Sequence, residues 1–177
     1  DLHNDLGLLA LALGDTQAAF DEFAQALQVD AHFAPARLNQ GSVLLHAGDY
    51  DGASEQYRAV LRDDAGNIDA HIGLGISLRG KGDHQAARQE YERVLQLSPN
   101  HPAALFNLAV LKAEFLDQRP DSRTYFQRFL DTGAATGSQR EVAERYLREI
   151  PDPNAAPAAH GQGGAGAAGH GGAHAGH

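Results

Sequence analysis

The stretch that decides the fold runs from Gly48 to Leu61. It reads Gly48-Asp49-Tyr50-Asp51-Gly52-Ala53, followed by Tyr57 and then by Val60-Leu61. The same order of glycine, aspartate, small, aromatic and apolar residues occurs 34 residues earlier and 34 residues later. A fixed interval of this length is typical of an array of stacked structural repeats. The two copies are Gly14-Asp15-Thr16, Ala19, Phe23 and Ala26-Leu27 upstream, and Gly82-Asp83-His84, Ala87, Tyr91 and Val94-Leu95 downstream.

Each period predicts two helices joined by a Gly-Asp turn. Glycine adopts the left-handed backbone conformation that ends many helices. The aspartate, or the residue beside it, is suited to cap the following helix, because a carboxylate accepts hydrogen bonds from the free N–H groups of a first turn. The repeating unit is therefore a helical hairpin.

A second set of glycines, Gly7, Gly41 and Gly75, recurs at the same interval inside the first helix of each pair. Glycine within a helix costs about 1 kcal/mol relative to alanine. Three such glycines at one phase predict that the two helices of a pair approach closely. The small residues Ala19, Ala53 and Ala87 fit this approach from the second helix, and Phe23, Tyr57 and Tyr91 then fill the space between neighbouring helices.

This pattern resembles the tetratricopeptide repeat (TPR) family from residue 1 to about residue 132. The small residues of both helices match, as do the aromatic residues four positions after Ala19, Ala53 and Ala87, and Pro99 matches the closing proline of the family. The tryptophan common in the first helix is absent, and His3, Arg37 and His71 occupy its phase. The resemblance implies an all-α fold, a right-handed superhelix of about four antiparallel helix pairs with a concave groove.

The repeats are expected at about 1–32, 33–66, 67–100 and 101–133, with a capping helix at 138–150. In the fourth repeat the turn reads Asp117-Gln118-Arg119-Pro120-Asp121 and the second-helix pattern resumes at Ser122, one residue late. We expect a one-residue insertion in this turn. The predicted helices lie near Leu2–Leu13, Thr16–Val29, Ala34–Ala47, Tyr50–Arg62, Ile68–Gly80, His84–Leu97, Ala103–Leu116 and Ser138–Ile150.

Bulk composition excludes several classes of protein. The formal net charge of −9 argues against nucleic-acid binding, which normally relies on a basic surface. There is no cysteine for a disulfide framework, and no apolar run approaches the roughly 20 residues that a membrane helix requires. The chain begins at Asp1 and has no methionine, from which we expect a processed or further N-terminal segment, a signal peptide or lipid anchor being candidates.

The resemblance implies that the groove residues come from the first helix of each pair, and that a partner protein binds there as a peptide or helical segment. In peptide-binding TPR proteins, an asparagine at the phase of Asn39 and Asn107 holds a peptide amide; the alternative is that these amides only solvate the groove. The basic residues of chaperone-type members are missing, since Asp69 and Gly73 occupy those positions. The expected partner-binding residues are Asn4, Leu8, Leu38, Asn39, Ser42, His46, Ile72, Ile76, Arg79, Phe106, Asn107 and Val110, with Asp5, Leu11, Leu45 and Asp69 at neighbouring phases.

Residues 151–177 form a low-complexity tail of Gly, Ala and His with no large apolar side chain. Such a composition predicts disorder for the isolated segment. Imidazole is a ligand for Zn, Ni and Cu, so His170, His174 and His177, with His160 farther upstream, are weak metal candidates. A solvated spacer or a loose partner-binding tail is the favoured interpretation, and no metal or cofactor is expected.

The remaining histidines share no phase that would form a catalytic triad, and the chain has no phosphate-binding loop, HExxH pattern or nucleophile elbow. We therefore expect no enzyme. The sequence predicts a protein-binding scaffold, a subunit or assembly factor of a bacterial multiprotein complex, with a membrane-associated complex as one candidate. Its expected compartment is the periplasm or cell envelope, with the cytoplasm left open. The alternatives are a metal-handling protein that uses the tail and a self-assembling solenoid.

Overall fold

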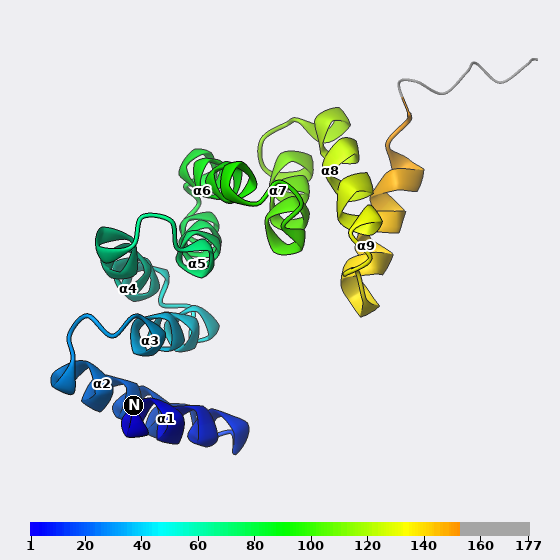
Figure 1. The fold of residues 1–177 in the computed structure, drawn as a ribbon. Helices are drawn as coiled ribbons and strands as arrows, with labels where there is room; N and C mark the ends of the chain where they lie inside the picture. The colour runs from blue at the N-terminus through cyan, green and yellow to red at the C-terminus, as the bar shows by residue number, and fades with distance from the viewer. Residues whose placement is uncertain (153–177) are drawn as a thin grey trace, which may run out of the picture.

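The computed structural model describes residues 1–152, in which the only regular elements are α-helices (Figure 1). The tail histidines considered above lie outside the described residues, and the boundary drawn at residue 150 stays a prediction. The helices are α1 (Leu2–Ala12), α2 (Thr16–Val29), α3 (Ala34–His46), α4 (Tyr50–Asp63), α5 (Ile68–Gly80), α6 (His84–Leu97), α7 (Pro102–Glu114), α8 (Arg119–Asp131) and α9 (Gly137–Glu149).

The helices pack as consecutive pairs, each pair stacking on the next along a curved array. Helices α3, α5 and α7 lie on the inner side of the curve, while α4 and α6 lie on the outer side (Figure 1). Neighbouring inner helices also contact one another, α3 with α5 and α5 with α7. The all-α array predicted from the repeats is confirmed.

The predicted turns form as the residue types require. Gly14, Gly48 and Gly82 have φ angles of 82°, 79° and 83°, the left-handed region that favours glycine. The carboxylate that follows each glycine caps the next helix. The caps are Asp15 Oδ1 to Ala18 N at 2.9 Å, Asp49 Oδ1 to Gly52 N at 2.9 Å, and Asp83 Oδ1 to Ala86 N at 3.2 Å.

The internal glycines allow the aromatic ring of the second helix to lie directly on the first helix. A Cβ atom at Gly7 would lie 2.5 Å from the Phe23 ring, and one at Gly75 would lie 2.4 Å from the Tyr91 ring. At Gly41 the corresponding distance to Tyr57 is 2.9 Å. The close approach predicted from the three glycines is confirmed.

The irregular fourth turn contains the predicted insertion. The connection between α7 and α8 comprises residues 115–118, one residue more than the connection 81–83 between α5 and α6. Asp117 accommodates the extra residue with a φ angle of 51°. Ser122 and Phe126 are fully buried, so they take the places of the small and aromatic residues one position late.

The residues that replace the expected tryptophan connect the two helices of a pair through polar contacts. His71 is buried, with Nδ1 2.6 Å from the Glu90 carboxylate and Nε2 3.1 Å from the Ala65 carbonyl oxygen. The same pairing occurs in the first two repeats, although the residue types change, whereas the fourth repeat has the buried Leu105 at this phase. The other two pairs are His3–Glu22 at 2.8 Å and Arg37–Gln56 at 2.9 Å.

Helix α9 covers the C-terminal end of the array. Tyr146 of α9 stacks on Phe126 of α8, with ring centroids 4.8 Å apart and planes 8° from parallel. Arg123 fixes the end of α9 by donating to the carbonyl oxygens of Leu147 and Ile150. Among the described helices, none combines the length and apolarity needed to cross a bilayer.

Tyr91→Phe should stabilise the protein by about 1 kcal/mol. The Tyr91 hydroxyl is buried without a hydrogen-bond partner, which raises its pKa well above the ordinary value, and an unsatisfied buried polar group costs about 1–3 kcal/mol. Phe23 shows that phenylalanine fills this position in the first repeat. Urea unfolding should give a higher midpoint than wild type. Tyr57→Phe is the matched control with a smaller expected change, and a lower midpoint for Tyr91→Phe would contradict the account.

His32 should titrate above its ordinary range. Its Nδ1 lies 2.8 Å from Asp63 Oδ2, and this hydrogen bond, together with the charge of Asp63, raises the pKa of His32 above 6.5. The contribution of the pair to stability is therefore full below about pH 6.5 and is lost as pH rises through the folded-state pKa. In an NMR titration, Asp63→Asn should lower the His32 midpoint, and an unchanged midpoint would disprove the pairing.

Candidate functional site

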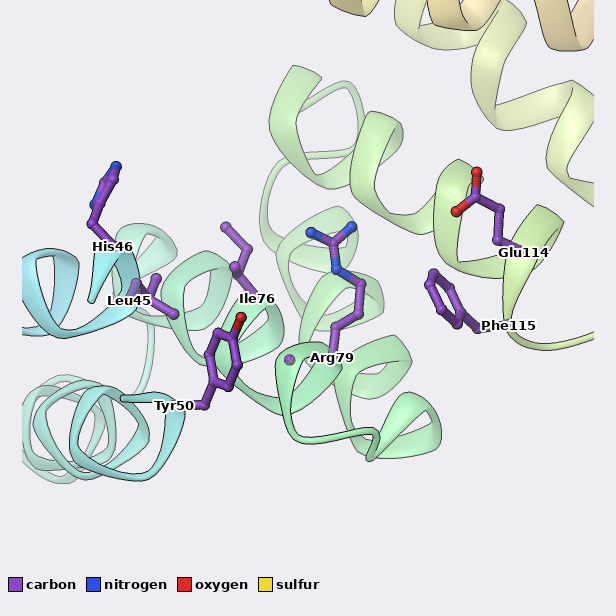
Figure 2. Close-up of a pocket in the computed structure, with 8 residues that line it drawn as sticks. Leu45, His46, Tyr50, Ile76, Arg79, Glu114 and Phe115 are labelled. Carbon is purple, nitrogen blue, oxygen red and sulfur yellow. The ribbon is translucent and has the colours of Figure 1, made fainter. Parts of the chain in front are cut away.

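The inner side of the array contains a pocket of about 660 Å³ where the C-terminal ends of α3, α5 and α7 meet the start of α4. Ile76 and Arg79 of α5 lie between side chains from α3 and side chains from the end of α7 (Figure 2). The pocket therefore spans three repeats. It is lined by Leu45, His46, Tyr50, Ile76, Arg79, Gly80, Glu114 and Phe115.

Arg79 places a positive charge inside this apolar pocket. Its side chain extends into the space between Ile76 and Phe115 (Figure 2). Within residues 1–152, Arg79 makes no hydrogen bond or ion pair, and the nearby Glu114 carboxylate accepts from the Tyr146 hydroxyl instead. The guanidinium group is thus available to a carboxylate or carbonyl group from outside the chain.

Two aromatic rings form the apolar walls. Phe115 is 45% exposed and its ring packs against His84, with centroids 4.6 Å apart. The ring of Tyr50 lies directly over Gly80, where an added Cβ would come within 2.5 Å of it. Both rings are supported by neighbouring residues while one side of each remains open to solvent, which favours binding of an apolar side chain.

The groove continues from this pocket toward α1. A smaller hollow of about 230 Å³ shares His46 with the pocket and is otherwise lined by Leu11, Thr16, Ser42 and Val43. His46 Nδ1 lies 2.8 Å from the Ser42 carbonyl oxygen, which orients the ring. The Nε2 atom has no partner within the described residues. His46 thus separates two adjoining hollows on the inner surface.

Each asparagine predicted to bind a peptide already uses one of its two amide N–H donors within the chain. Asn39 Nδ2 donates to Oδ1 of the buried Asn4 at 2.9 Å, and Asn107 Nδ2 donates to the Ala103 carbonyl oxygen at 2.9 Å. The Asn39 oxygen accepts no hydrogen bond from the described residues. The structure therefore leaves Asn39 with an oriented acceptor and one further N–H donor, and its role toward a peptide stays a prediction.

The other predicted groove residues lie on the inner helices but do not form one continuous pocket. Leu38, Ile72 and Ile76 are half-buried and pack against the central core, while Phe106 and Val110 pack against the C-terminal core. Leu8, Asp5, Leu11 and Asp69 are exposed. Of the predicted residues, the structure brings Leu45, His46, Ile76 and Arg79 together in the larger pocket.

Sequence reasoning missed Tyr50, Gly80, Glu114 and Phe115. These residues lie at helix ends and in connections, outside the first-helix phases from which the groove was predicted. Gly80 could have been identified from the sequence, because α5 has glycines at 73 and 80 in addition to the periodic Gly75. Extra glycines within one helix indicate close approach by neighbouring side chains.

In the part of the chain that the structure describes, no three His, Asp or Glu side chains are grouped closely enough to hold a metal ion. The inner surface combines apolar walls with one oriented imidazole, one guanidinium group and the Glu114 carboxylate.

Two family models described as tetratricopeptide repeat match the sequence, one over residues 10–75 and the other over residues 68–101. Together they cover slightly more than half of the chain. The chain belongs to the tetratricopeptide repeat family. TPR domains generally serve as scaffolds for protein–protein interaction and are typically non-catalytic. No curated protein matches the sequence.

Solved TPR structures share the fold at low sequence identity. MamA from Desulfovibrio magneticus RS-1, from residue 41 to its end, superposes with a TM-score of 0.68 at 20% identity, covering 77% of this chain and 76% of that one. TTC0263, a thermophilic TPR protein of Thermus thermophilus, gives a TM-score of 0.68 at 18% identity, covering 83% and 78%. The first TPR of Spaghetti (RPAP3), bound to the HSP90 peptide SRMEEVD, gives 0.61 at 19% identity, covering 63% and 88%. At these identities the likeness concerns the TPR fold alone.

Proposed function

We propose that this TPR protein is a non-catalytic scaffold that binds a segment of another protein in its inner groove. It acts as a subunit or assembly factor of a bacterial multiprotein complex, with the periplasm or cell envelope as its compartment. The observation that carries the proposal is the pocket across α3, α5 and α7, in which exposed aromatic rings surround an arginine without a hydrogen bond or ion pair inside residues 1–152.

The lining residues favour a particular kind of segment. Tyr50, Ile76 and Phe115 offer apolar surface to one bulky side chain of the partner. Arg79 suits a carboxylate placed beside that anchor, because a guanidinium group pairs with carboxylates through two parallel hydrogen bonds. The partner segment is therefore a short stretch with a large apolar residue next to an acidic one.

The bound peptide of the RPAP3 TPR is also acidic, which supports a peptide as the occupant.

The basic residues expected in chaperone-type TPR proteins are absent here for a steric reason at residue 73. A Cβ atom on Gly73 would lie 2.3 Å from the Tyr57 ring, so this position has no room for a basic side chain. Recognition is instead centred on Arg79, between one and two helical turns farther along α5.

Peptide selection tests the proposal. A displayed library of random short peptides would be selected against the full chain, and the enriched peptides titrated by fluorescence anisotropy. Enriched peptides should carry an acidic residue beside a large apolar one. Phe115→Ala and Arg79→Ala should each weaken binding about tenfold or more, since central aromatic and arginine residues contribute most of the binding energy in interfaces.

Leu97→Ala is the matched control, because Leu97 is an exposed apolar residue that does not line the pocket. The Leu97→Ala variant should bind the enriched peptides with the same affinity as the wild-type chain. Peptides that bind equally well to the Arg79 and Phe115 variants would place recognition elsewhere and overturn the proposal.

A further inference from the structure

The two hollows of the inner surface are built from the same repeat positions. Four of the five residues that line the smaller hollow have a counterpart 34 residues later in the larger pocket. The pairs are Leu11 and Leu45, Thr16 and Tyr50, Ser42 and Ile76, and His46 and Gly80. The groove therefore carries the same hollow twice, one repeat apart, with different side chains.

The smaller hollow belongs to the groove side of the array and not to the face that packs against a neighbouring helix pair. Leu45 has a helix pair on either side of its own, and it still lines the open pocket. Leu11 holds the equivalent position on α1 and is 37% exposed. Stacking of helix pairs thus leaves this position accessible.

The side chains give the two hollows different capacities. The larger pocket, of about 660 Å³, has the rings of Tyr50 and Phe115 in its walls. The smaller hollow, of about 230 Å³, has Thr16 at the position of Tyr50, while Leu11 and Val43 supply its apolar walls. The larger pocket therefore suits a bulky side chain, and the smaller hollow suits one aliphatic side chain.

His46 lies between the two hollows and offers a hydrogen-bond acceptor. Figure 2 shows it at one end of the larger pocket, with Phe115 at the other end. The carbonyl oxygen of Ser42 can only accept a hydrogen bond, so the Nδ1 atom 2.8 Å from it carries the hydrogen. In the neutral imidazole, Nε2 is then an acceptor, and none of the described residues donates to it.

This acceptor favours an extended partner segment over a helical one. A helix uses most of its backbone N–H groups in its own hydrogen bonds, whereas an extended segment has them available for other acceptors. A backbone N–H of an extended segment that passes from one hollow to the other is therefore the natural donor to His46 Nε2.

The spacing of the hollows determines the spacing of the two anchors. Counterpart residues lie one helix pair apart, and packed helices are roughly 8–10 Å from one another. An extended chain advances about 3.3 Å per residue, so the two anchors are about three residues apart. A helical segment, with a rise of about 1.5 Å per residue, would need about six or seven.

We propose that the partner segment binds in an extended conformation through two anchors. A large apolar residue occupies the pocket across α3, α5 and α7, and an aliphatic residue about three positions away occupies the hollow formed by α1, α2 and α3. One backbone N–H between the anchors donates to His46 Nε2. This inference rests on the proposed function, because it specifies the segment that the same groove binds.

A focused peptide library tests the second anchor. Displayed peptides with a fixed Glu-Phe-Glu core and eight randomised residues on each side would be selected against the full chain. An aliphatic residue should be enriched about three positions from the phenylalanine. Ser42→Ile should abolish this preference and weaken binding of the enriched peptides about fivefold or more, because isoleucine fills the smaller hollow and residue 42 does not line the larger pocket.

The chain provides a matched control for this variant. An apolar residue occurs at the position of Ser42 in each of the other repeats, where Leu8, Ile76 and Val110 lie, so isoleucine is compatible with the fold. Val110→Ile introduces the same side chain at the same phase but outside both hollows. Selection against Val110→Ile should retain the aliphatic preference.

Backbone N-methylation of one enriched peptide tests the hydrogen bond to His46. Each residue would be N-methylated in turn, and each peptide titrated by fluorescence anisotropy against the wild-type chain and against His46→Phe, which keeps a ring but removes the acceptor. Methylation at one residue between the anchors should weaken binding to wild type about three- to tenfold, the effect of one hydrogen bond. The same methylation should weaken binding to His46→Phe by clearly less.

The outcomes separate this inference from the proposed function. Peptides that require Arg79 and Phe115 but show no aliphatic preference, show it about six or seven positions away, or bind Ser42→Ile unchanged would overturn the two-anchor proposal and leave the proposed function in place. Equal losses on N-methylation in both proteins would refute the hydrogen bond to His46. Peptides indifferent to Arg79→Ala and Phe115→Ala would overturn the proposed function, and this inference with it.

Discussion

Phe126→Ala is expected to lower the free energy of unfolding by about 3–5 kcal/mol, the range for truncating a fully buried phenylalanine. Phe126 has no exposed surface, stacks on Tyr146 of α9 and meets Phe106 of α7 edge-on, with centroids 6.3 Å apart. Its removal leaves a cavity between the fourth helix pair and the capping helix. The loss is a large fraction of the roughly 5–15 kcal/mol that typically stabilises a domain.

The effect should be concentrated at the C-terminal end, because each repeat of a stacked array contacts only its neighbours. Hydrogen exchange should show lost protection in α8 and α9 while α3, α4 and α5 remain protected. Phe115→Ala is the control, since Phe115 is 45% exposed and should lower stability by only about 1 kcal/mol. Equal destabilisation by both variants would show that the Phe126 cluster does not hold α9 in place.

Gly73→Ala is expected to lower the free energy of unfolding by about 2 kcal/mol, although alanine favours a helix more than glycine does. A Cβ at residue 73 would lie 2.3, 2.4 and 2.6 Å from three carbons of the Tyr57 ring. The ring has no room to retreat because Gly41 borders it on the other side, where a Cβ would lie 2.9 Å away. Overpacking at about 3 kcal/mol therefore outweighs the gain of about 1 kcal/mol in helix propensity.

Gly66→Ala serves as the control for this glycine. The nearest atom to a Cβ at residue 66 is Asp64 Oδ1 at 3.5 Å, an ordinary contact, so chemical denaturation should give a midpoint close to that of wild type. The double variant Gly73→Ala/Tyr57→Leu should regain part of the loss, because leucine leaves room for the methyl group. A Gly73→Ala midpoint at or above wild type would mean that the helices of adjacent repeats are not as closely packed as described.

The fold could be predicted from the sequence because the features that determine it are local and repeated. Gly48 with Asp49 specifies a helix end and a helix start within two residues, and the same pair recurs at each turn. The delayed pattern at Ser122 and Phe126 indicates an insertion, which the structure places at Asp117. Each of these inferences needs only the sequence interval and the conformational preference of one residue type.

The pocket could be predicted only in part, because it depends on contacts between repeats. The helical phase identifies Ile76 and Arg79, whereas Tyr50 and Phe115 reach the same pocket from a helix start and a connection. The hydrogen bond from Asn39 to Asn4 also joins two repeats, so the periodic pattern gives no sign that one of the two Asn39 N–H donors is occupied. Distances across a stack follow from its curvature, which the repeat interval does not specify.

Site-specific photo-cross-linking in bacterial cells that express the full chain tests the central claim, that the inner groove binds a partner segment. A photoreactive amino acid would be placed at Ile76 in the pocket and, as a matched position, at the exposed Arg58 on the outer helix α4. The account predicts one discrete cross-linked protein from residue 76, none from residue 58, and loss of the cross-link when Phe115→Ala is added. A partner captured from residue 58 but not from residue 76, or a cross-link from residue 76 that Phe115→Ala leaves unaffected, would contradict it.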